Sequence, residues 1–243
     1  MAKVSGKNAI ILVNGINYST MAFSLDGEDN AGMIDVTGFT EGGQNFIPGL
    51  PSGKLSIGMY WDSTATVGSS PVFGAFPTGN VTVIPNGYAL GNQSLSMPFM
   101  MGNYAPHGEP AGSVQLGTLN FEAYGSTFRG IEHGWMLAHA TITATTTGTG
   151  VLDPADAAVT AVCGATLHIW TACAADTYVV KVQHSSDNNT FADLVTFVAN
   201  GSAITTERQV IASGTINKYR RVLATRTGAA ANPFGYSVHF WHA

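Results

Sequence analysis

Charged residues are scarce in this sequence. Only 10% of the 243 residues are Asp, Glu, Lys or Arg, whereas soluble proteins average about 25%. Glycine is abundant, with 29 residues. This composition predicts a neutral and polar surface, much of which we expect neighbouring copies of the chain to cover.

Basic residues are especially few in the first half. Residues 1–145 contain four basic and nine acidic residues, whereas residues 146–243 contain six of each. The nine acids are Asp26, Glu28, Asp29, Asp35, Glu41, Asp62, Glu109, Glu122 and Glu132. Tight phosphate binding requires Lys and Arg side chains that replace the counterions condensed on a nucleic acid. We therefore predict that DNA could pass the first half without specific binding.

Cysteine is limited to Cys163 and Cys173, and neither belongs to a CxxC or Cys/His cluster with metal-ligand spacing. Buried, unpaired thiols are the favoured interpretation, and a disulfide is the alternative.

Long apolar runs are also missing. Lys3 and Lys7 precede only the short run Ala9–Val13, which does not match a secretory signal. No stretch approaches the roughly 18 apolar residues that a membrane-spanning helix needs. We predict that the protein is synthesised in the cytoplasm and does not associate with a membrane.

A run of small residues at Thr143–Gly150, TATTTGTG, divides the chain into two halves. A chain of 25.3 kDa can form one large all-β unit or two domains of ordinary size. We favour two domains, residues 1–145 and residues 146–243.

Apolar and polar residues alternate in the first half, which predicts strands. The segment from Ile10 to Ser19 is typical of a hairpin, because Asn14-Gly15 tolerates the positive φ angles of a type I′ turn. Leu55, Ile57, Met59 and Trp61 alternate with polar or small residues, as in a strand with one buried face. Further strands are predicted at Val81–Ile84, Leu95–Met101, Val114–Ala123 and Trp135–Ile142.

Shorter strands are predicted in the second half, with Ser185–Asn189 as the turn of one hairpin. They lie at Leu167–Thr171, Tyr178–His184, Leu194–Val198, Gln209–Ile211, Tyr219–Thr225 and Phe234–Trp241. This spacing is typical of a β-sandwich. The predicted fold class is therefore all-β, with Gly42–Gly53 and Asn103–Gly112 as loops and at most one short helix, at Pro71–Phe76.

Seven histidines raise the question of a metal site. His107, His133, His139, His168, His184, His239 and His242 fall in separate segments without an HxH or HExxH arrangement. On a strand, His239 and His242 should face opposite sides. Structural or surface roles are favoured, and no metal is predicted.

Catalytic groups are equally hard to find. The Gly68-Ser69-Ser70 turn lacks the GxSxG context of a serine nucleophile. Asp26, Glu28 and Asp29 are interpreted as solvated loop acids, and Glu41 as the start of a glycine turn, with calcium binding as the minor alternative. Gly42-Gly43 lacks the context of a phosphate loop. We predict no catalytic residue, no cofactor and no enzymatic activity.

Two further groups of side chains are weighed in the second half. Arg220 and Arg221 should face opposite sides of a strand, so that together with Arg226 they are expected to pair with acids rather than to bind phosphates. Most aromatic residues should be core. On the last strand Phe234, Tyr236, Val238 and Phe240 are expected to share one face, and Trp241 on the other is the candidate for a sugar-binding platform.

Three segments of the first half resemble the tail tube proteins of long-tailed bacteriophages. They are Met33–Phe39 (MIDVTGF), Phe46–Leu50 (FIPGL) and Lys54–Asp62 (KLSIGMYWD). In that family a similar stretch, with Asp-Val-Thr and a later Pro-Gly-Leu, leads into an alternating strand that ends in Asp. The second half resembles a domain found in phage structural proteins through Val182–Asp187, Phe191–Phe197 and Asn217–Val222.

This resemblance implies a structural virion protein of the tail. Six copies would form a ring, each contributing strands to an inner barrel, and the rings would stack into a tube through which DNA passes. Closure would pair every sheet edge with a neighbour. The expected partners are other copies and other tail proteins, with host-surface glycans as a possible contact of residues 146–243.

Two other functions stay open at this point. Tube proteins have a clear helix packed against the sheet, and that helix is faint here, so a capsid decoration or head-surface protein is an alternative. A carbohydrate-binding adhesin module that uses the aromatic residues of the second half is another.

Overall fold

A computed structural model describes residues 8–36, 44–62, 72–75, 77–107, 116–125, 130–152, 158–198 and 202–243. These residues are mostly in strands, which confirms the predicted all-β class. Val72 and Phe73 are helical, within the segment expected to be a short helix, and Pro71 and Phe76 lie outside the described residues. In the described ranges no helix has the length and apolar character needed to cross a membrane.

The chain forms two compact units. Unit 1 comprises Met1–Thr20, Gly79–Ser96 and Glu132–Ala243, and unit 2 comprises Met21–Thr78 and Met97–Ile131. The chain thus passes between the units several times, and strand β6 runs from one into the other. Two domains at residues 1–145 and 146–243 remain a prediction, because compactness does not measure independent folding.

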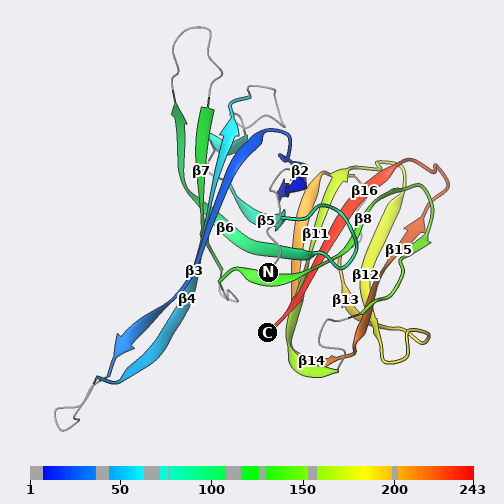
Figure 1. Cartoon of the computed structure of the whole chain (residues 1–243). Coiled ribbons are helices and arrows are strands. Elements are labelled where there is room, and N and C mark those ends of the chain that lie inside the picture. Colours follow the sequence, from blue (N-terminus) through cyan, green and yellow to red (C-terminus); the bar gives the residue numbers. More distant parts are fainter. Residues whose placement is uncertain are drawn as a thin grey trace. The chain divides into compact units, whose positions relative to one another are not determined.

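Unit 1 contains most of a first sheet, which continues into unit 2 through β6, and the whole of a second sheet (Figure 1). The first sheet has the order β14-β11-β16-β8-β6-β5-β1-β2, and the second has β10-β15-β12-β13 with β9 beside β15. The strands of the first sheet are β14 (Thr205–Ile216), β11 (Val159–Thr171), β16 (Phe234–His242), β8 (Glu132–Ile142), β6 (Gln93–His107), β5 (Thr78–Ile84), β1 (Ile10–Val13) and β2 (Ile16–Asn17). Those of the second are β10 (Val151–Leu152), β15 (Tyr219–Thr227), β12 (Thr177–Ser185), β13 (Ala192–Thr196) and β9 (Thr146–Thr147).

The core of unit 1 lies between these sheets, as in a β-sandwich. Phe234, Tyr236, Val238 and Phe240 all belong to it, which confirms the face expected from their alternation in the sequence. Strand β8 also contributes, because it pairs with β16 from Phe234↔Ile142 to Trp241↔Gly134. The C-terminal sandwich therefore includes a strand that lies before residue 145.

The N-terminal hairpin confirms the Asn-Gly prediction. Asn14 and Gly15 have φ angles of 50° and 85° between β1 and β2. A Cβ atom on Gly15 would lie 2.4 Å from the carbonyl oxygen of Ile169 and 2.7 Å from that of Thr205. The turn therefore needs glycine both for its conformation and for its close approach to β11 and β14.

Unit 2 is built on four strands. Strand β3 (Ala22–Asp35) pairs with β4 (Phe46–Tyr60), β4 pairs with β7 (Leu116–Ala123), and β7 pairs with the second part of β6. Leu55, Ile57 and Phe121 are fully or almost fully buried, and the Phe121 ring contacts Phe73 and Phe99 edge to face.

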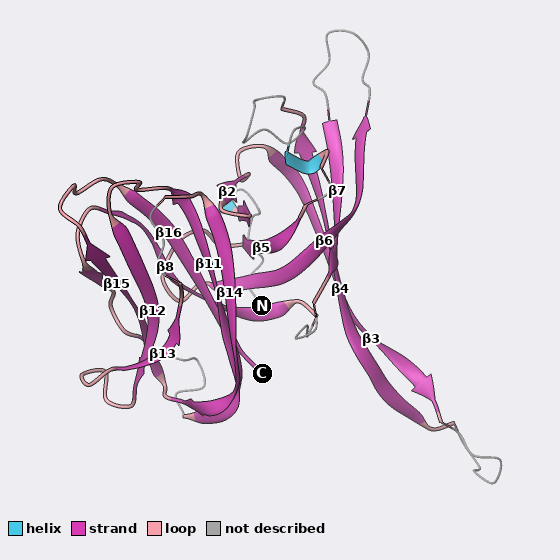
Figure 2. Cartoon of the chain, turned by 180° about the vertical axis from the view of Figure 1, so that it is seen from behind, coloured by secondary structure: helices cyan, strands magenta, loops and turns pink. Residues whose placement is uncertain are grey.

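Strands β3 and β4 form a long two-stranded ribbon that extends beyond β7 (Figure 2). Strand β7 supports β4 only from Lys54 to Tyr60, whereas the pairing of β3 with β4 continues to Asp35↔Phe46. Among the described residues, β3 pairs with β4 alone. Beyond Lys54 the described part of the ribbon thus consists of β3 and β4 without a third strand.

Two predicted loops are wrong. Phe46–Gly53 belongs to β4 and Asn103–His107 belongs to β6. Glycine and proline made both stretches look like turns, but pairing with β3 and β7 supplies their backbone partners and holds them extended. Gly42, Gly43 and residues 108–112 lie outside the described residues.

Buried polar groups in unit 1 form a continuous hydrogen-bonded chain. The Gly15 N–H donates to His168 Nδ1 at 3.2 Å, and His168 Nε2 lies 2.8 Å from Thr82 Oγ1. Thr82 contacts the Ser96 hydroxyl, which donates to Thr166. Since Nδ1 accepts a hydrogen bond from the Gly15 N–H, the neutral imidazole must carry its own proton on Nε2. Burial lowers the pKa of His168 to about 3.

We predict that the protein loses stability as the pH falls from 6.5 towards 4. Burial lowers the pKa of both His168 and His239 to about 3, so the unfolded chain takes up protons at these residues before the folded chain does. Each such proton reduces the free energy of unfolding by up to about 1.4 kcal/mol per pH unit. Urea denaturation at several pH values measures the slope.

The variant His168→Gln provides the control, because an amide can accept from Gly15 and donate to Thr82. In this variant the free energy of unfolding should fall less steeply with decreasing pH, because one of the two buried histidines no longer contributes. A slope equal to that of the wild type would show that His168 does not cause the effect.

Candidate assembly surface

One face of the unit 2 sheet carries an acidic row. Glu28 on β3 lies opposite Lys54 on β4, and Lys54 lies opposite Glu122 on β7. The next positions along the strands are Asp26, Ser56 and Asn120. Directly paired residues in an antiparallel sheet point to the same face. Three carboxylates and one ammonium group therefore meet at this face, which we call the acidic face.

The acidic face is exposed and slightly hollowed. Asp26, Glu28, Lys54 and Glu122 are all solvent-exposed, and they line a depression of about 330 Å³. Leu55 and Phe121 also line it, although their side chains are almost fully buried. With one base among three acids, this surface repels an approaching phosphate.

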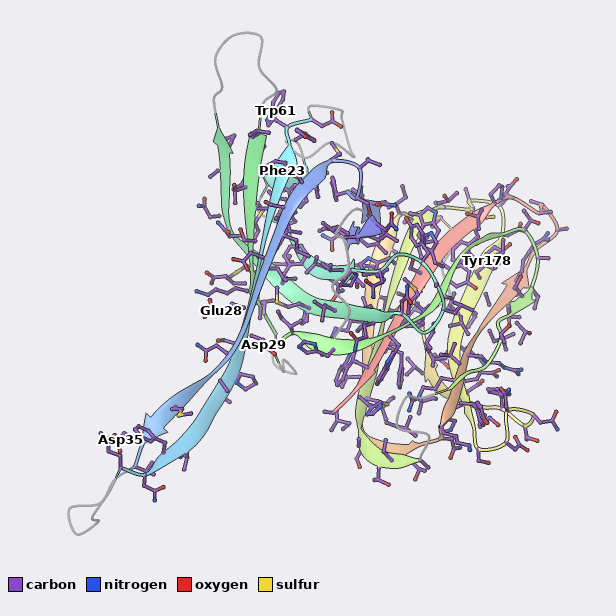
Figure 3. The ribbon with its side chains drawn as sticks, viewed as in Figure 1. Phe23, Glu28, Asp29, Asp35, Trp61 and Tyr178 are labelled. Atoms are coloured by element: carbon purple, nitrogen blue, oxygen red, sulfur yellow. The ribbon has the colours of Figure 1, made fainter. Side chains whose placement is uncertain are left out.

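The structure corrects the prediction of an acidic loop. Asp26, Glu28 and Asp29 lie on strand β3, and Figure 3 shows Glu28 and Asp29 there. Only Asp26 and Glu28 belong to the acidic face. The Asp29 Oδ1 atom instead accepts a hydrogen bond from the Ile131 backbone N–H at 3.2 Å. Glu41 lies outside the described residues. The spacing of Asp26 and Glu28 was the available signal, because alternate strand residues share a face. Their meeting with Glu122 depends on β4 and could not be inferred.

Large apolar side chains are exposed at both ends of the β3–β4 ribbon. At one end Phe23 is 51%, Tyr60 43% and Trp61 41% exposed. We call these three residues the aromatic patch. At the other end lie the five exposed residues of the ribbon tip, namely Met33, Val36, Phe46, Ile47 and Leu50. Alternation in the sequence gave no sign of either group, because it predicts a buried face wherever apolar residues repeat.

The histidines serve several structural roles. His239 Nδ1 lies 2.6 Å from the Ser94 hydroxyl, and His184 Nδ1 accepts a hydrogen bond from the Asn217 N–H. His139 is stacked between Tyr88 and Trp170, with ring centroids 3.6 Å and 4.3 Å away. Burial lowers the pKa of His139 to about 4.

The other three histidines lie at or next to the ends of strands. His133 is exposed on β8, His242 packs beside Trp135, and His107 ends β6 with its side chain outside the described residues. No three His, Cys, Asp or Glu side chains of the described ranges are grouped as metal ligands would be. The Gly68-Ser69-Ser70 turn falls outside those ranges.

The remaining candidates of unit 1 are mostly core. Cys163 and Cys173 are free and buried, which confirms the favoured interpretation over a disulfide. Trp241 is only 2% exposed, with the Arg208 guanidinium 5.7 Å from the centre of its ring, so it cannot present a face to a sugar.

The arginines of β15 lie on opposite faces, as predicted. Arg220 is buried against Phe240, whereas Arg221 lies over the Phe191 ring at 3.8 Å. Arg226 forms the expected pair with an acid, its Nε atom lying 3.2 Å from Asp176 Oδ2.

We predict that neutralising an acid of the acidic face costs little stability. Glu122→Gln should change the free energy of unfolding by less than about 1 kcal/mol, because exposed ion pairs contribute little. The matched control is Glu132→Gln, which removes a buried carboxylate that accepts from Arg208 Nε at 3.0 Å. That change should lower the free energy of unfolding by about 3–5 kcal/mol, because it leaves the buried Arg208 charge without its carboxylate. Urea denaturation compares the two variants, and a large loss in Glu122→Gln would mean that the acidic face is needed for folding.

Comparison with known proteins gives likenesses only among solved structures. No protein-family model and no curated protein matches the sequence. The chain is similar to a chain from the C6-symmetric tail of an empty gene transfer agent particle, with 16% identity, a TM-score of 0.40, and 52% of this chain and 98% of that chain covered.

Two further likenesses extend over different shares of the chain. One is to a chain of the sheath–tube complex of an extracellular contractile injection system, PVC, in its extended state. The identity is 11% and the TM-score 0.43, and the match covers 55% of this chain and 92% of that chain. The other is to the Dit protein of phage SPP1, described as a paradigm of the hub adsorption apparatus in phages that infect Gram-positive bacteria. The identity is 12% and the TM-score 0.39, and the match covers 97% of this chain and 99% of that chain.

Proposed function

We propose that this protein is a structural subunit of a bacteriophage tail that assembles into stacked hexameric rings and so forms the tail tube. The resemblance of Met33–Phe39, Phe46–Leu50 and Lys54–Asp62 to tail tube proteins supports the family. The observation that carries the proposal is the β3–β4 ribbon. Among the described strands, β3 is the longest that pairs with another strand on one side only.

The ribbon requires partners for its backbone. Strand β3 is 14 residues long and, among the residues that the structure describes, pairs with β4 on one side only. The other edge presents N–H and C=O groups that can pair with another strand. In a ring, an edge strand of the next copy supplies these partners, and six repeats leave no lateral edge open.

The exposed apolar residues support assembly as well. Leu50 is 91% and Met33 77% exposed. A contiguous apolar surface on a monomer marks an interaction site, and an isolated two-stranded hairpin is at best marginally stable in water. Contact with further copies would cover both the side chains and the backbone edge.

The acidic face suits the wall of a DNA channel. Three carboxylates and one ammonium group in each copy would be repeated six times around the lumen. Such a wall lacks the clustered Lys and Arg that bind phosphates, so DNA would pass without adhering. The neutral segment 146–243 would lie on the exterior of the tube. The protein would be synthesised in the host cytoplasm and become part of the virion tail. Binding of host glycans by that segment stays a prediction.

We predict that the purified protein forms hollow tubes or stacked rings. Negative-stain electron microscopy and sedimentation velocity at increasing concentration test this. Trimers without tubes would favour a capsid decoration protein. A strictly monomeric chain at every concentration would contradict the proposal.

We further predict that the acidic face controls adhesion of DNA. The triple variant Asp26→Lys, Glu28→Lys and Glu122→Lys keeps Lys54 and changes the charge of the face from −2 to +4, because three acids and one base become four bases. Tubes of the variant should retain double-stranded DNA at low salt and release it as the salt concentration rises. Co-sedimentation of DNA with tubes measures the difference.

Wild-type tubes serve as the reference for this experiment. If they retain DNA as strongly as the variant does, the acidic face does not line the channel.

A further inference from the structure

The first sheet curls until strands that are distant in its order face each other. Strands β11 and β6 are separated by β16 and β8, yet the Ser96 hydroxyl on β6 donates to Thr166 Oγ1 on β11 at 3.1 Å. One strand further along, Thr82 Oγ1 on β5 lies 2.8 Å from His168 Nε2 on β11. Neighbouring strands are about 4.8 Å apart, so a flat sheet would keep these side chains out of contact. The curl thus encloses a space between β11 and β14 on one side and β5 and β6 on the other, which we call the polar interior.

The turn between β1 and β2 closes the polar interior. Its Gly15 N–H donates to His168 Nδ1 at 3.2 Å, and its Asn14 Oδ1 accepts from the Asn80 backbone N–H on β5 at 3.0 Å. The Asn80 side chain in turn donates to Thr206 Oγ1 on β14 at 3.5 Å. The turn and β5 are therefore fastened to β11 and β14 by hydrogen bonds.

The polar interior is held differently from the sandwich. The sandwich core joins buried apolar side chains of both sheets, such as Phe240 of β16 and Val182 of β12. Beside the polar interior, one small apolar cluster on β1, β5 and β8 consists of Ile10, Leu12, Ile84 and Met136. Strands β11 and β14 meet these strands through the hydrogen bonds above and the Arg208–Glu132 ion pair. Since a hydrogen bond contributes less net free energy than burial of a large apolar side chain, the polar interior can open at lower cost than the sandwich.

A proton on either buried histidine conflicts with the closed arrangement. His168 Nδ1 accepts from the Gly15 N–H, so a proton on Nδ1 would face a second donor. His239 Nε2 has no hydrogen-bond partner among the described residues, so a charge on that ring would be left without an acceptor there. Burial accordingly lowers the pKa of both rings to about 3. In water a histidine has a pKa of about 6.5, so acid favours the state in which water reaches these rings.

The charged groups around the two histidines do not compensate for this. Arg208 on β14 adds a positive charge, and Glu132 on β8 is already paired with it. Beyond burial, Arg208 and His133 lower the pKa of His239 further. His139, also on β8, is hydrogen-bonded to Ser237 and is the other histidine on this face of the sheet. Strands β1, β2 and β5 contain no charged residue.

We propose that unit 1 contains an acid-sensitive closure: when His168 is protonated, the β1–β2 turn and β5 move away from β11 and β14 while the sandwich stays folded. All of these contacts lie within unit 1, so the inference does not depend on the proposed tail function. Parts of a domain that have few apolar contacts open locally before the whole domain unfolds. Between pH 6.5 and pH 5 the ratio of open to closed molecules should rise about tenfold for each histidine that opening exposes to water.

Thiol labelling compares the two parts of unit 1 in one molecule. The change Ser96→Cys places a thiol in the polar interior, because Ser96 is fully buried there. The natural thiols Cys163 and Cys173 report on the sandwich, since both are buried in its core. A pyridyl disulfide reagent labels thiols in mild acid, and mass spectrometry of the peptides identifies each site. Dividing every rate by that of the urea-unfolded protein at the same pH removes the effect of pH on thiol reactivity.

We expect the thiol introduced by Ser96→Cys to react at least tenfold faster than Cys163 at pH 5. Its corrected rate should rise about tenfold or more between pH 6.5 and pH 5, and adding His168→Gln should reduce this rise by about tenfold. The matched control is His184→Gln. His184 Nδ1 also accepts from a backbone N–H, that of Asn217, but it lies on β12 in the second sheet, so the rise should be unchanged.

Hydrogen exchange of the wild-type protein gives the same information without a substitution in the polar interior. The Gly15 amide, which donates to His168, should lose protection between pH 6.5 and pH 5, whereas the amides of β12 should keep theirs. Equal corrected rates for the introduced thiol and Cys163 would overturn the proposal, because the whole unit would then open in one step. A labelling rate that does not depend on pH, or that is unaffected by His168→Gln, would overturn it as well.

Discussion

Backbone hydrogen bonding is the constraint on which this structure depends. Every strand presents N–H and C=O groups that are costly to leave without a partner. In unit 1 the central strands find their partners within the chain, since β11 is paired with β14 on one side and β16 on the other. The described parts of β14 in unit 1 and of β3 in unit 2 are each paired on one side only. Strand β3 differs because it belongs to a ribbon that, among the described residues, continues beyond β7 without a third strand.

The buried polar groups of unit 1 follow the same rule. His168 lies in the interior because Gly15 and Thr82 satisfy both of its ring nitrogens, and buried polar groups are tolerated when they are hydrogen-bonded. Glu132 is buried because Arg208 neutralises it. These contacts join the β1–β2 turn, β5, β8, β11 and β14, so they hold distant segments of the chain in one scaffold.

Charge and apolar surface are separated along the ribbon. Asp26 and Glu28 are two residues apart on β3, and β4 and β7 bring Lys54 and Glu122 to the same face. Exposed apolar residues gather at the two ends instead. Charged and apolar exposed side chains therefore occupy separate parts of one sheet, as the proposed channel requires.

The sequence by itself determined the features that depend on neighbouring residues. The Asn14-Gly15 turn was predicted because only certain residues adopt positive φ, and the buried face of β16 because alternate residues of a strand share a face. Tertiary structure decided the rest. Phe46–Gly53 is a strand rather than a loop because β3 pairs with it, and Trp241 is buried because Arg208 and Gly164 lie against it. Pairing across a sheet joins residues far apart in the chain, and no local pattern specifies which strand will be the partner.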